Sequence, residues 1–217
     1  MHAFRTLLLI ALFGISAGAQ ARGGNDAPGR FDYYAMALSW SPSFCATNRD
    51  PDQCDSGRKL GFVLHGLWPQ YEAGYPEECS REPLPGAVRG RYAAIYPSEK
   101  LIGHEWKKHG TCSGLDPAAY FALSARLKEQ LVIPRQFQQP SQPVRISNGD
   151  FIQAFSAANP GMARDSVLPY CAGGGRFLRE IHACFDKSGK SRSCSNGEIK
   201  RSYSSCRQQS FLLESVR

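Results

Sequence analysis

The sequence has no apolar run long enough to cross a membrane. Its most apolar stretch, TLLLIALF at 6–13, falls well short of the ~20 residues that a spanning helix needs. The stretch follows a short start that carries Arg5, and the residues at 19–21 match the A-x-A pattern of a cleavage site. We therefore predict a signal peptide over 1–21, and an exported protein without a membrane partner.

Internal repeats, low-complexity tracts and long linkers are also absent. Of the 217 residues, 42% are hydrophobic, an ordinary fraction for a globular chain. The part that follows 1–21 is long enough for one domain to bury its own core. The sequence thus predicts a single domain over 22–217.

Acidic side chains are in the minority, because 19 Asp and Glu face 26 Lys and Arg. A basic exported protein favours polyanionic partners such as nucleic acid, polysaccharide or a lipid surface. Charge alone supports this only weakly, since many basic proteins bind no particular polyanion.

No two cysteines have the C-x-x-C spacing that is typical of zinc sites. An even number of cysteines in an exported chain predicts disulfides, here four, and we expect neither a metal nor a cofactor. The spacing itself does not select one pairing. The eight positions all follow the predicted signal peptide: Cys45, Cys54, Cys79, Cys112, Cys171, Cys184, Cys194 and Cys206.

Strands are predicted where apolar and aromatic residues alternate or run together. These are 31–40 and 58–68, and the stretch 176–194 is predicted to form two antiparallel strands around a turn at 187–190. No strand–helix unit repeats along the chain. The predicted class is therefore α+β.

Helices are predicted over 99–109, 116–131 and 149–158. The second is the clearest, because Asp116 can cap it and Pro117 suits its first position. Residues 132–146 hold three prolines and are expected to form a loop.

Histidine is scarce, with five in the chain. Three of the five fall in two short stretches, HGLWPQ at 65–70 and HEWKKHGTC at 104–112. Because imidazole titrates near neutral pH, such a cluster indicates either proton transfer or metal binding.

The spacing argues against a metal. HEWKKH resembles the zinc-protease motif H-E-x-x-H, in which two histidines sit four apart on one helix face. His104 and His109 are five apart, which separates them by about 140° on a helix. The two histidines could not both coordinate one metal ion unless the helix were distorted. This spacing excludes a zinc hydrolase.

The same helix would bring His104, Lys108, Glu105 and His109 onto one wide face, within about 140° of arc. Trp106 points elsewhere and is expected to pack. Two imidazoles, an ammonium and a carboxylate suit acid–base catalysis on an anion, with Lys108 offsetting developing negative charge. The alternative is an ordinary solvated face of a charged helix.

These two histidine stretches resemble the active-site signatures of the ribonuclease T2 family. FDYYAMALSWSPSFC at 31–45 also resembles the opening of its bacterial periplasmic or secreted members, and the likeness extends through the C-terminal cysteines. The resemblance implies an α+β fold with a central antiparallel sheet, packed helices and disulfides. It further implies an endoribonuclease that cleaves single-stranded RNA without a metal, through a 2′,3′-cyclic phosphate.

Matched position by position, the resemblance makes His65 the general acid and His109 the general base. Glu105 and Lys108 would support the pentavalent intermediate, and His104 would bind phosphate. The reaction needs these functions, because the 2′-hydroxyl must lose a proton, the 5′-oxygen must gain one, and charge develops on phosphorus.

Base recognition is less defined by the resemblance. Trp68 matches an aromatic residue associated with base binding, and the variable stretch after HGLWP brings Gln70, Tyr71 and Tyr75 into consideration as base contacts. For Tyr71 and Tyr75 packing within a loop is an equal alternative. His182 matches no catalytic position and is interpreted as structural.

The resemblance also implies disulfides. It pairs Cys79 with Cys112, Cys171 with Cys206 and Cys184 with Cys194, which leaves Cys45 for Cys54. Together these features predict a periplasmic or secreted monomer that acts on RNA. The alternative is a catalytically silent exported protein that binds RNA or polysaccharide, and the intact set of His65, Glu105, Lys108 and His109 favours the enzyme.

Overall fold

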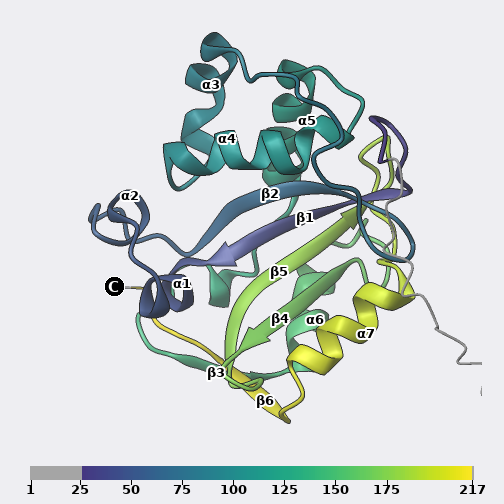
Figure 1. The fold of residues 1–217 in the computed structure, drawn as a ribbon. Coiled ribbons are helices and arrows are strands. Elements are labelled where there is room, and N and C mark those ends of the chain that lie inside the picture. Colours follow the sequence, from purple (N-terminus) through teal and green to yellow (C-terminus); the bar gives the residue numbers. More distant parts are fainter. Residues whose placement is uncertain (1–25, 217) are drawn as a thin grey trace, which may run out of the picture.

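The computed structural model describes residues 26–216, so the predicted signal peptide lies outside the described residues. A six-stranded sheet occupies the centre, with helices packed around it (Figure 1). Its strands are β1 Tyr33–Trp40, β2 Phe62–Gln70, β3 Val144–Ser147, β4 Val167–Ala172, β5 Phe177–Phe185 and β6 Ser210–Leu213. The order is β2-β1-β5-β6-β3, and β4 pairs with β5.

The helices lie on two sides of this sheet. Next to β2 are α3, α4 and α5, whereas α7 lies beside β4 (Figure 1). Their bounds are α1 Ser41–Thr47, α2 Pro51–Cys54, α3 Gly86–Tyr92, α4 Glu99–Lys108, α5 Pro117–Gln130, α6 Asn148–Ala158 and α7 Asn196–Ser205. Within residues 26–216 no helix combines the length and apolar character that a bilayer crossing requires.

The α+β class is confirmed, with one qualification to the antiparallel sheet. Every other strand pair is antiparallel, but β5 and β6 meet in parallel through Phe177 and Leu212. The predicted strands at 31–40 and 58–68 correspond to β1 and β2, and the three predicted helices to α4, α5 and α6. As expected, the Asp116 carboxylate caps α5 by accepting from the backbone N–H of Ala119.

The return strand predicted within 176–194 is wrong. After β5 the chain turns, but it makes only one isolated bridge, between Phe185 and Ser191. Both edges of β5 are already taken, by β1 on one side and β4 on the other, so no edge remains for a returning strand. The expected loop over 132–146 likewise gives way to β3 at Val144.

Alternation along the strands divides the sheet into two faces. On the first face, Tyr34, Met36, Leu38 and Trp40 of β1 join the main core with α4, α5 and α6. On the second, Tyr33 and Ala35 pack with Leu168, Tyr170 and, from α7, Ile199. The second face is thus covered at the α7 end, and elsewhere it opens to the cleft described below.

A β-bulge in β2 sits at His65. Ala37 of β1 pairs with Gly66 and the next residue, Leu38, pairs with Leu64, so His65 is an extra residue in the ladder. Bulges re-aim side chains and are common beside active sites.

The four expected disulfides are all present: Cys45–Cys54, Cys79–Cys112, Cys171–Cys206 and Cys184–Cys194. The second of them joins the loop after β2 to the short 3-10 turn at Gly110–Cys112 that follows α4. It therefore links the two histidine stretches covalently.

Candidate active site

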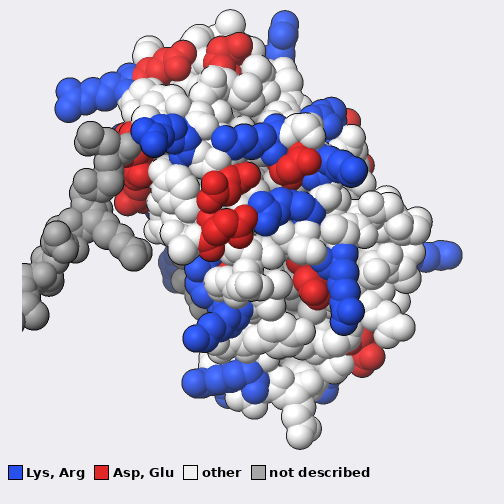
Figure 2. Space-filling model, turned by 90° about the vertical axis from the view of Figure 1, so that its right-hand side faces the viewer, with Lys and Arg blue, Asp and Glu red and all other residues white. Residues whose placement is uncertain are grey.

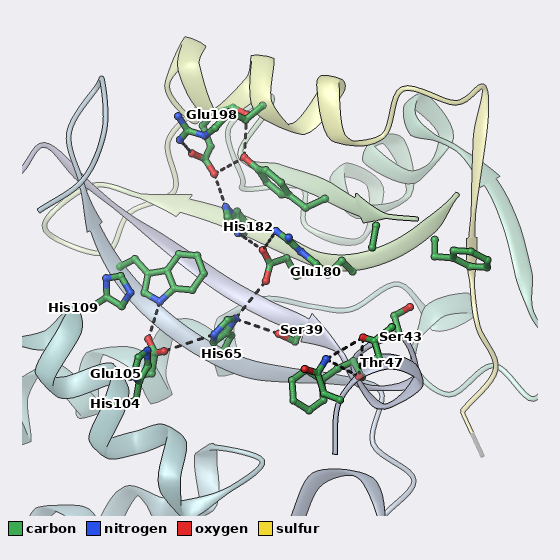
Figure 3. A pocket seen from close by; sticks show the side chains of 18 of the residues that line it. Ser39, Ser43, Thr47, His65, His104, Glu105, His109, Glu180, His182 and Glu198 are labelled. Atoms are coloured by element: carbon green, nitrogen blue, oxygen red, sulfur yellow. Dashed lines mark hydrogen bonds and ion pairs between the residues drawn. The ribbon is translucent and has the colours of Figure 1, made fainter. Parts of the chain in front are cut away.

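A cleft of about 870 Å³ opens on the second face of the sheet (Figure 3). Of the eight residues predicted for catalysis and substrate binding, seven line it: His65, Trp68, Gln70, His104, Glu105, Lys108 and His109. Strand β2 supplies the first three from the sheet, and α4 with the residue after it supplies the rest from the sheet's edge. The two histidine stretches therefore meet at one place.

The exception is Tyr71, which does not line the cleft. Its hydroxyl donates to Asp26 at 3.0 Å and its ring packs against the main core, so the packing alternative describes it. Tyr75 does line the cleft, half exposed, with its ring centroid 6.4 Å from that of His109. Buried Gln70 lines the cleft too, with its amide donating to the carbonyl of Pro69.

Trp68 occupies the middle of the site. Its Nε1 donates to Glu105 Oε2 at 2.7 Å. Its ring meets His65 edge-on, with centroids 5.0 Å apart, and stacks on His109 at 5.2 Å. This tryptophan therefore stands between the two histidines that were predicted to act as acid and base.

Gly66 is required by this arrangement. A Cβ at position 66 would lie 1.9 Å from Glu105 Oε2 and 2.4 Å from Trp68 Nε1. Both separations are far shorter than van der Waals contact. Only glycine at position 66 therefore allows the Glu105 side chain of α4 to pack against β2.

The two ring nitrogens of His65 face different surroundings. Nδ1 lies 3.3 Å from Ser39 Oγ and 3.4 Å from Glu180 Oε2, while Nε2 lies 3.8 Å from Glu105 Oε1 (Figure 3). The carboxylate of Glu180 can only accept, so it favours a proton on Nδ1 and directs Nε2 across the site.

His109 is buried, and it is not part of the helix as predicted. Helix α4 ends at Lys108, and His109 is its C-cap residue, whose N–H donates to the Glu105 carbonyl at 3.0 Å. Burial, reinforced by Lys108 and His65, lowers the pKa of His109 to about 3. The imidazole is therefore neutral near physiological pH, as a general base must be.

Glu105 is almost completely enclosed, with 1% of its surface exposed. Burial raises the pKa of its carboxyl to about 7, against the opposing effects of His65 and of the hydrogen bond from Trp68. Near neutrality it can therefore carry a proton and donate a hydrogen bond.

The other two α4 residues predicted for the site lie nearer solvent. Lys108 is partly exposed, with Nζ 3.7 Å from Glu77 Oε2. His104 is exposed, and slight burial together with the charges of Lys108 and His65 lowers its pKa. Trp106 is in the core, as expected, with its Nε1 donating to the Glu82 carbonyl.

Sequence reasoning missed the contribution of β5. Glu180 and His182 line the cleft beside His65, and neither was predicted to take part. The available signal was the alternation in FLREIHACF, which sets Glu180 and His182 on the same face of the strand. In the part of the chain from 26 to 216, no group of three or more His, Cys, Asp or Glu side chains is arranged to hold a metal ion.

The comparisons with known proteins address the family. The model of the ribonuclease T2 family matches residues 31–194, which include both histidine stretches. The chain belongs to the ribonuclease T2 family. A protein of Aeromonas hydrophila named ribonuclease is 43% identical over 211 residues, covering 93% of each chain.

Two more distant proteins are also similar to this chain. Ribonuclease I of Escherichia coli K12 is 26% identical over 203 residues, covering 70% of this chain and 74% of that protein. Among solved structures, an RNase-related protein from Calystegia sepium matches with a TM-score of 0.63 at 20% identity, over 76% of this chain and 91% of its own. At that identity the match shows a shared fold.

Proposed function

We propose that this member of the ribonuclease T2 family is an exported endoribonuclease that cleaves single-stranded RNA by transphosphorylation. The observation that carries the proposal is the contrast between its two central imidazoles. His109 is buried and holds a neutral ring, whereas His65 is partly exposed with a carboxylate beside Nδ1. The reaction needs one imidazole that is free to accept a proton and another that is held in place to donate one.

In the proposed reaction His109 removes the proton of the 2′-hydroxyl, whose oxygen then attacks the adjacent phosphorus. His65 protonates the departing 5′-oxygen, and the product is a 2′,3′-cyclic phosphate. Lys108 offsets the charge on the pentavalent phosphorus, and protonated Glu105 can donate to one of its oxygens. His104, exposed at the cleft, holds a phosphate, and Tyr75 offers a face for an unpaired base. DNA lacks the internal nucleophile and would bind without being cleaved.

Location and assembly are part of the same proposal. The four disulfides support an oxidising compartment, here the periplasm or the outside of the cell, reached by means of the signal peptide at 1–21. We expect a monomer that does not attach to membranes. On the face drawn in Figure 2, basic and acidic side chains are interspersed, so the overall positive charge is not gathered there into one continuous patch.

The test is a digest of RNA by the purified protein in excess chelator, with the ends of the fragments analysed. Fragments that end in 2′,3′-cyclic phosphate, and their loss in His109→Ala, are expected. Binding of RNA without cleavage would favour the silent binding protein instead. Activity that chelator abolishes and a divalent ion restores would contradict the metal-independent mechanism.

A further inference from the structure

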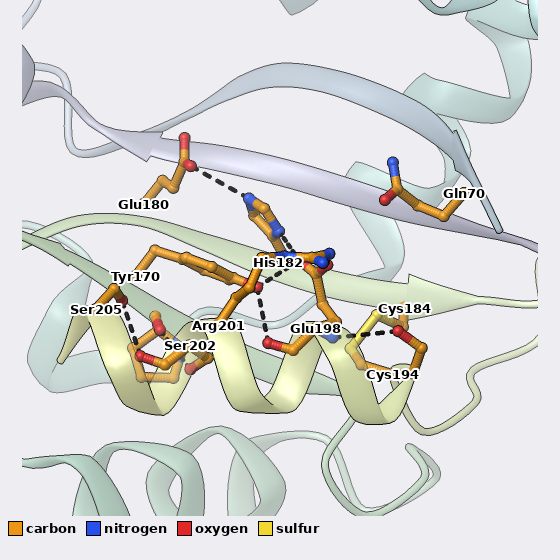
Figure 4. A network of polar contacts seen from close by, with 12 residues as sticks. Gln70, Tyr170, Glu180, His182, Cys184, Cys194, Glu198, Arg201, Ser202 and Ser205 are labelled. Carbon is orange, nitrogen blue, oxygen red and sulfur yellow. Dashed lines mark hydrogen bonds and ion pairs between the residues drawn. A yellow bond between two sulfur atoms is a disulfide. The ribbon is translucent and has the colours of Figure 1, made fainter. Parts of the chain in front are cut away.

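A chain of buried ionisable side chains runs from the cleft to α7 (Figure 4). Glu180 and His182 of β5 and Glu198 of α7 are only 5%, 7% and 2% exposed. His182 Nε2 lies 3.2 Å from Glu180 Oε1, and its Nδ1 bonds Glu198. At the far end Glu198 pairs with Arg201 and accepts from the hydroxyl of Tyr170.

The buried side chains of this row carry alternating charges. Both ring nitrogens of His182 face carboxylates, so both must donate, and the ring is an imidazolium. Burial alone would lower the pKa of His182, but the hydrogen bonds from the two carboxylates outweigh it and raise the pKa. Burial likewise opposes the charge on Glu180 and Glu198, yet their bonds with His182 hold both pKa values below the usual range.

The two oxygens of Glu180 have separate partners. Oε1 accepts from Arg179 Nη2 at 2.6 Å and from His182, whereas Oε2 faces Nδ1 of His65 at 3.4 Å. Arg179 and His182 therefore hold the carboxylate through Oε1, and Oε2 is left to contact His65.

Stability does not account for this arrangement. Burying paired charges typically gains little over apolar residues of the same volume, because desolvation offsets the attraction. The register of the sheet brings Glu180 opposite Ser39, and both side chains contact the same nitrogen of His65. The row of buried side chains therefore ends at Nδ1 of His65.

We propose that Glu180 is a positioning residue for His65, and that the buried pair of His182 and Glu198 holds Glu180 in place. By accepting from Nδ1–H, Glu180 fixes the orientation of the ring, so that Nε2–H points at the departing 5′-oxygen. This inference rests on the proposed function, since it assigns a reason for the acid role of His65. A carboxylate on the far nitrogen of a catalytic histidine sets orientation and tautomer in the same way in serine proteases.

The test compares Glu180→Gln with the wild type on two substrates. On RNA the 5′-alkoxide must be protonated as it leaves, so kcat should fall ~10- to 100-fold, part of the ~10²–10⁴-fold that positioned proton transfer contributes. On a nucleoside 3′-nitrophenyl phosphate, whose leaving group needs no proton, the rate should stay within about threefold. KM should be unchanged on both, because Glu180 is not proposed to touch substrate.

A second readout does not depend on activity. In nitrogen-15 spectra of the wild type, neutral His65 should carry its proton on Nδ1, and Glu180→Gln should move the population toward the Nε2–H form. Glu72→Gln is the matched control, because Glu72 is an exposed carboxylate paired with Arg192 away from the cleft. Neither its rates nor the His65 tautomer should change.

Glu180→Asp covers the case in which Glu180→Gln does not fold. It keeps the charge beside His182 but shortens the side chain, which withdraws the carboxylate from His65, so the same split between substrates is expected. Equal losses on both substrates, an unchanged rate on RNA, or an unchanged tautomer in a folded variant would overturn the proposal. A wild type that cleaves no RNA would instead refute the proposed function. The comparison of His65 tautomers would still test whether Glu180 orients His65.

Discussion

Replacement of Gly66 by alanine tests the way in which the two histidine stretches fit together. The added Cβ would fall 1.9 Å from Glu105 Oε2 and 2.4 Å from Trp68 Nε1, two atoms joined by a hydrogen bond. Glu105 has no free space to move into, because it is 1% exposed, and any movement of Trp68 toward the cleft would disturb its contacts with His65 and His109. The substitution must therefore break the bond or push α4 away from β2.

The expected magnitude follows from those two effects. Overpacking a well-packed site costs ~1–3 kcal/mol, and leaving a buried polar group without its partner costs ~1–3 kcal/mol more. The sum, roughly 2–6 kcal/mol, is a large part of a typical stability of ~5–15 kcal/mol. For a chain of this size it corresponds to a drop in Tm of roughly 5–20 °C. Displacement of Glu105 by about 1 Å should in addition lower kcat by ~10²-fold.

Thermal unfolding with the disulfides intact and cleavage of RNA would measure both effects. Gly90→Ala is the matched control, since nothing lies within 4 Å of the Cβ it would add in α3. That variant should be slightly more stable than the wild type, because alanine is the better helix residue by ~0.5–1 kcal/mol. A Gly66→Ala protein with wild-type Tm and activity would refute the close packing of Glu105 against β2.

Four further predictions concern the site. On RNA both His65→Ala and His109→Ala should lose ~10²–10⁴-fold in rate, but on a nucleoside 3′-nitrophenyl phosphate only His65→Ala should recover; rescue of His109→Ala instead would reverse the assigned roles. His104→Ala should raise KM more than it lowers kcat, and steady-state kinetics with a large drop in kcat alone would contradict phosphate binding. Replacing Cys79 and Cys112 by serine should cost ~2–5 kcal/mol in urea unfolding and lower activity more than removal of any other disulfide. Burial lowers the pKa of His109 from 6.5 to about 3, so the unfolded chain binds the extra proton between these values. The folded state therefore loses stability as pH falls through them, by up to ~5 kcal/mol. His109→Gln should have a shallower decline in unfolding experiments from pH 6.5 to 3.

The elements that sequence predicted correctly are those with a strong local pattern. The aromatic alternation of β1 and the capped start of α5 at Asp116 are visible without the fold. Strand β4 was missed, because its VLPYCA is short and interrupted by Pro169, and it is a strand only since β5 offers it an edge. Helix α7 was missed because its sequence is strongly polar, and its N-cap at Ser195 gives the clearest local signal.

The residues of the site also divide into those that a local pattern predicts and those that depend on the fold. The α4 residues could be predicted because they are close in sequence, although His109 proved to follow the helix rather than belong to it. The meeting of His65 with Glu180, 115 residues away, depends on the register between β1 and β5, which local patterns do not determine. Tyr71 and Tyr75 could not be distinguished either, since the choice depends on the path of the loop after β2.

The bulge at His65 has a consequence for insertions and deletions in this gene. With residue 65 removed, Leu64 and Gly66 would become neighbours, and the regular pairing of Ala37 with Gly66 and of Leu38 with Leu64 would continue without interruption. Every other side chain of β2 would keep its face of the sheet, because the bulge is the point at which the alternation is offset by one. If His65 is the general acid, as proposed, loss of a single codon would thus remove the acid and leave the alternation of β2 on both sides of the deletion intact.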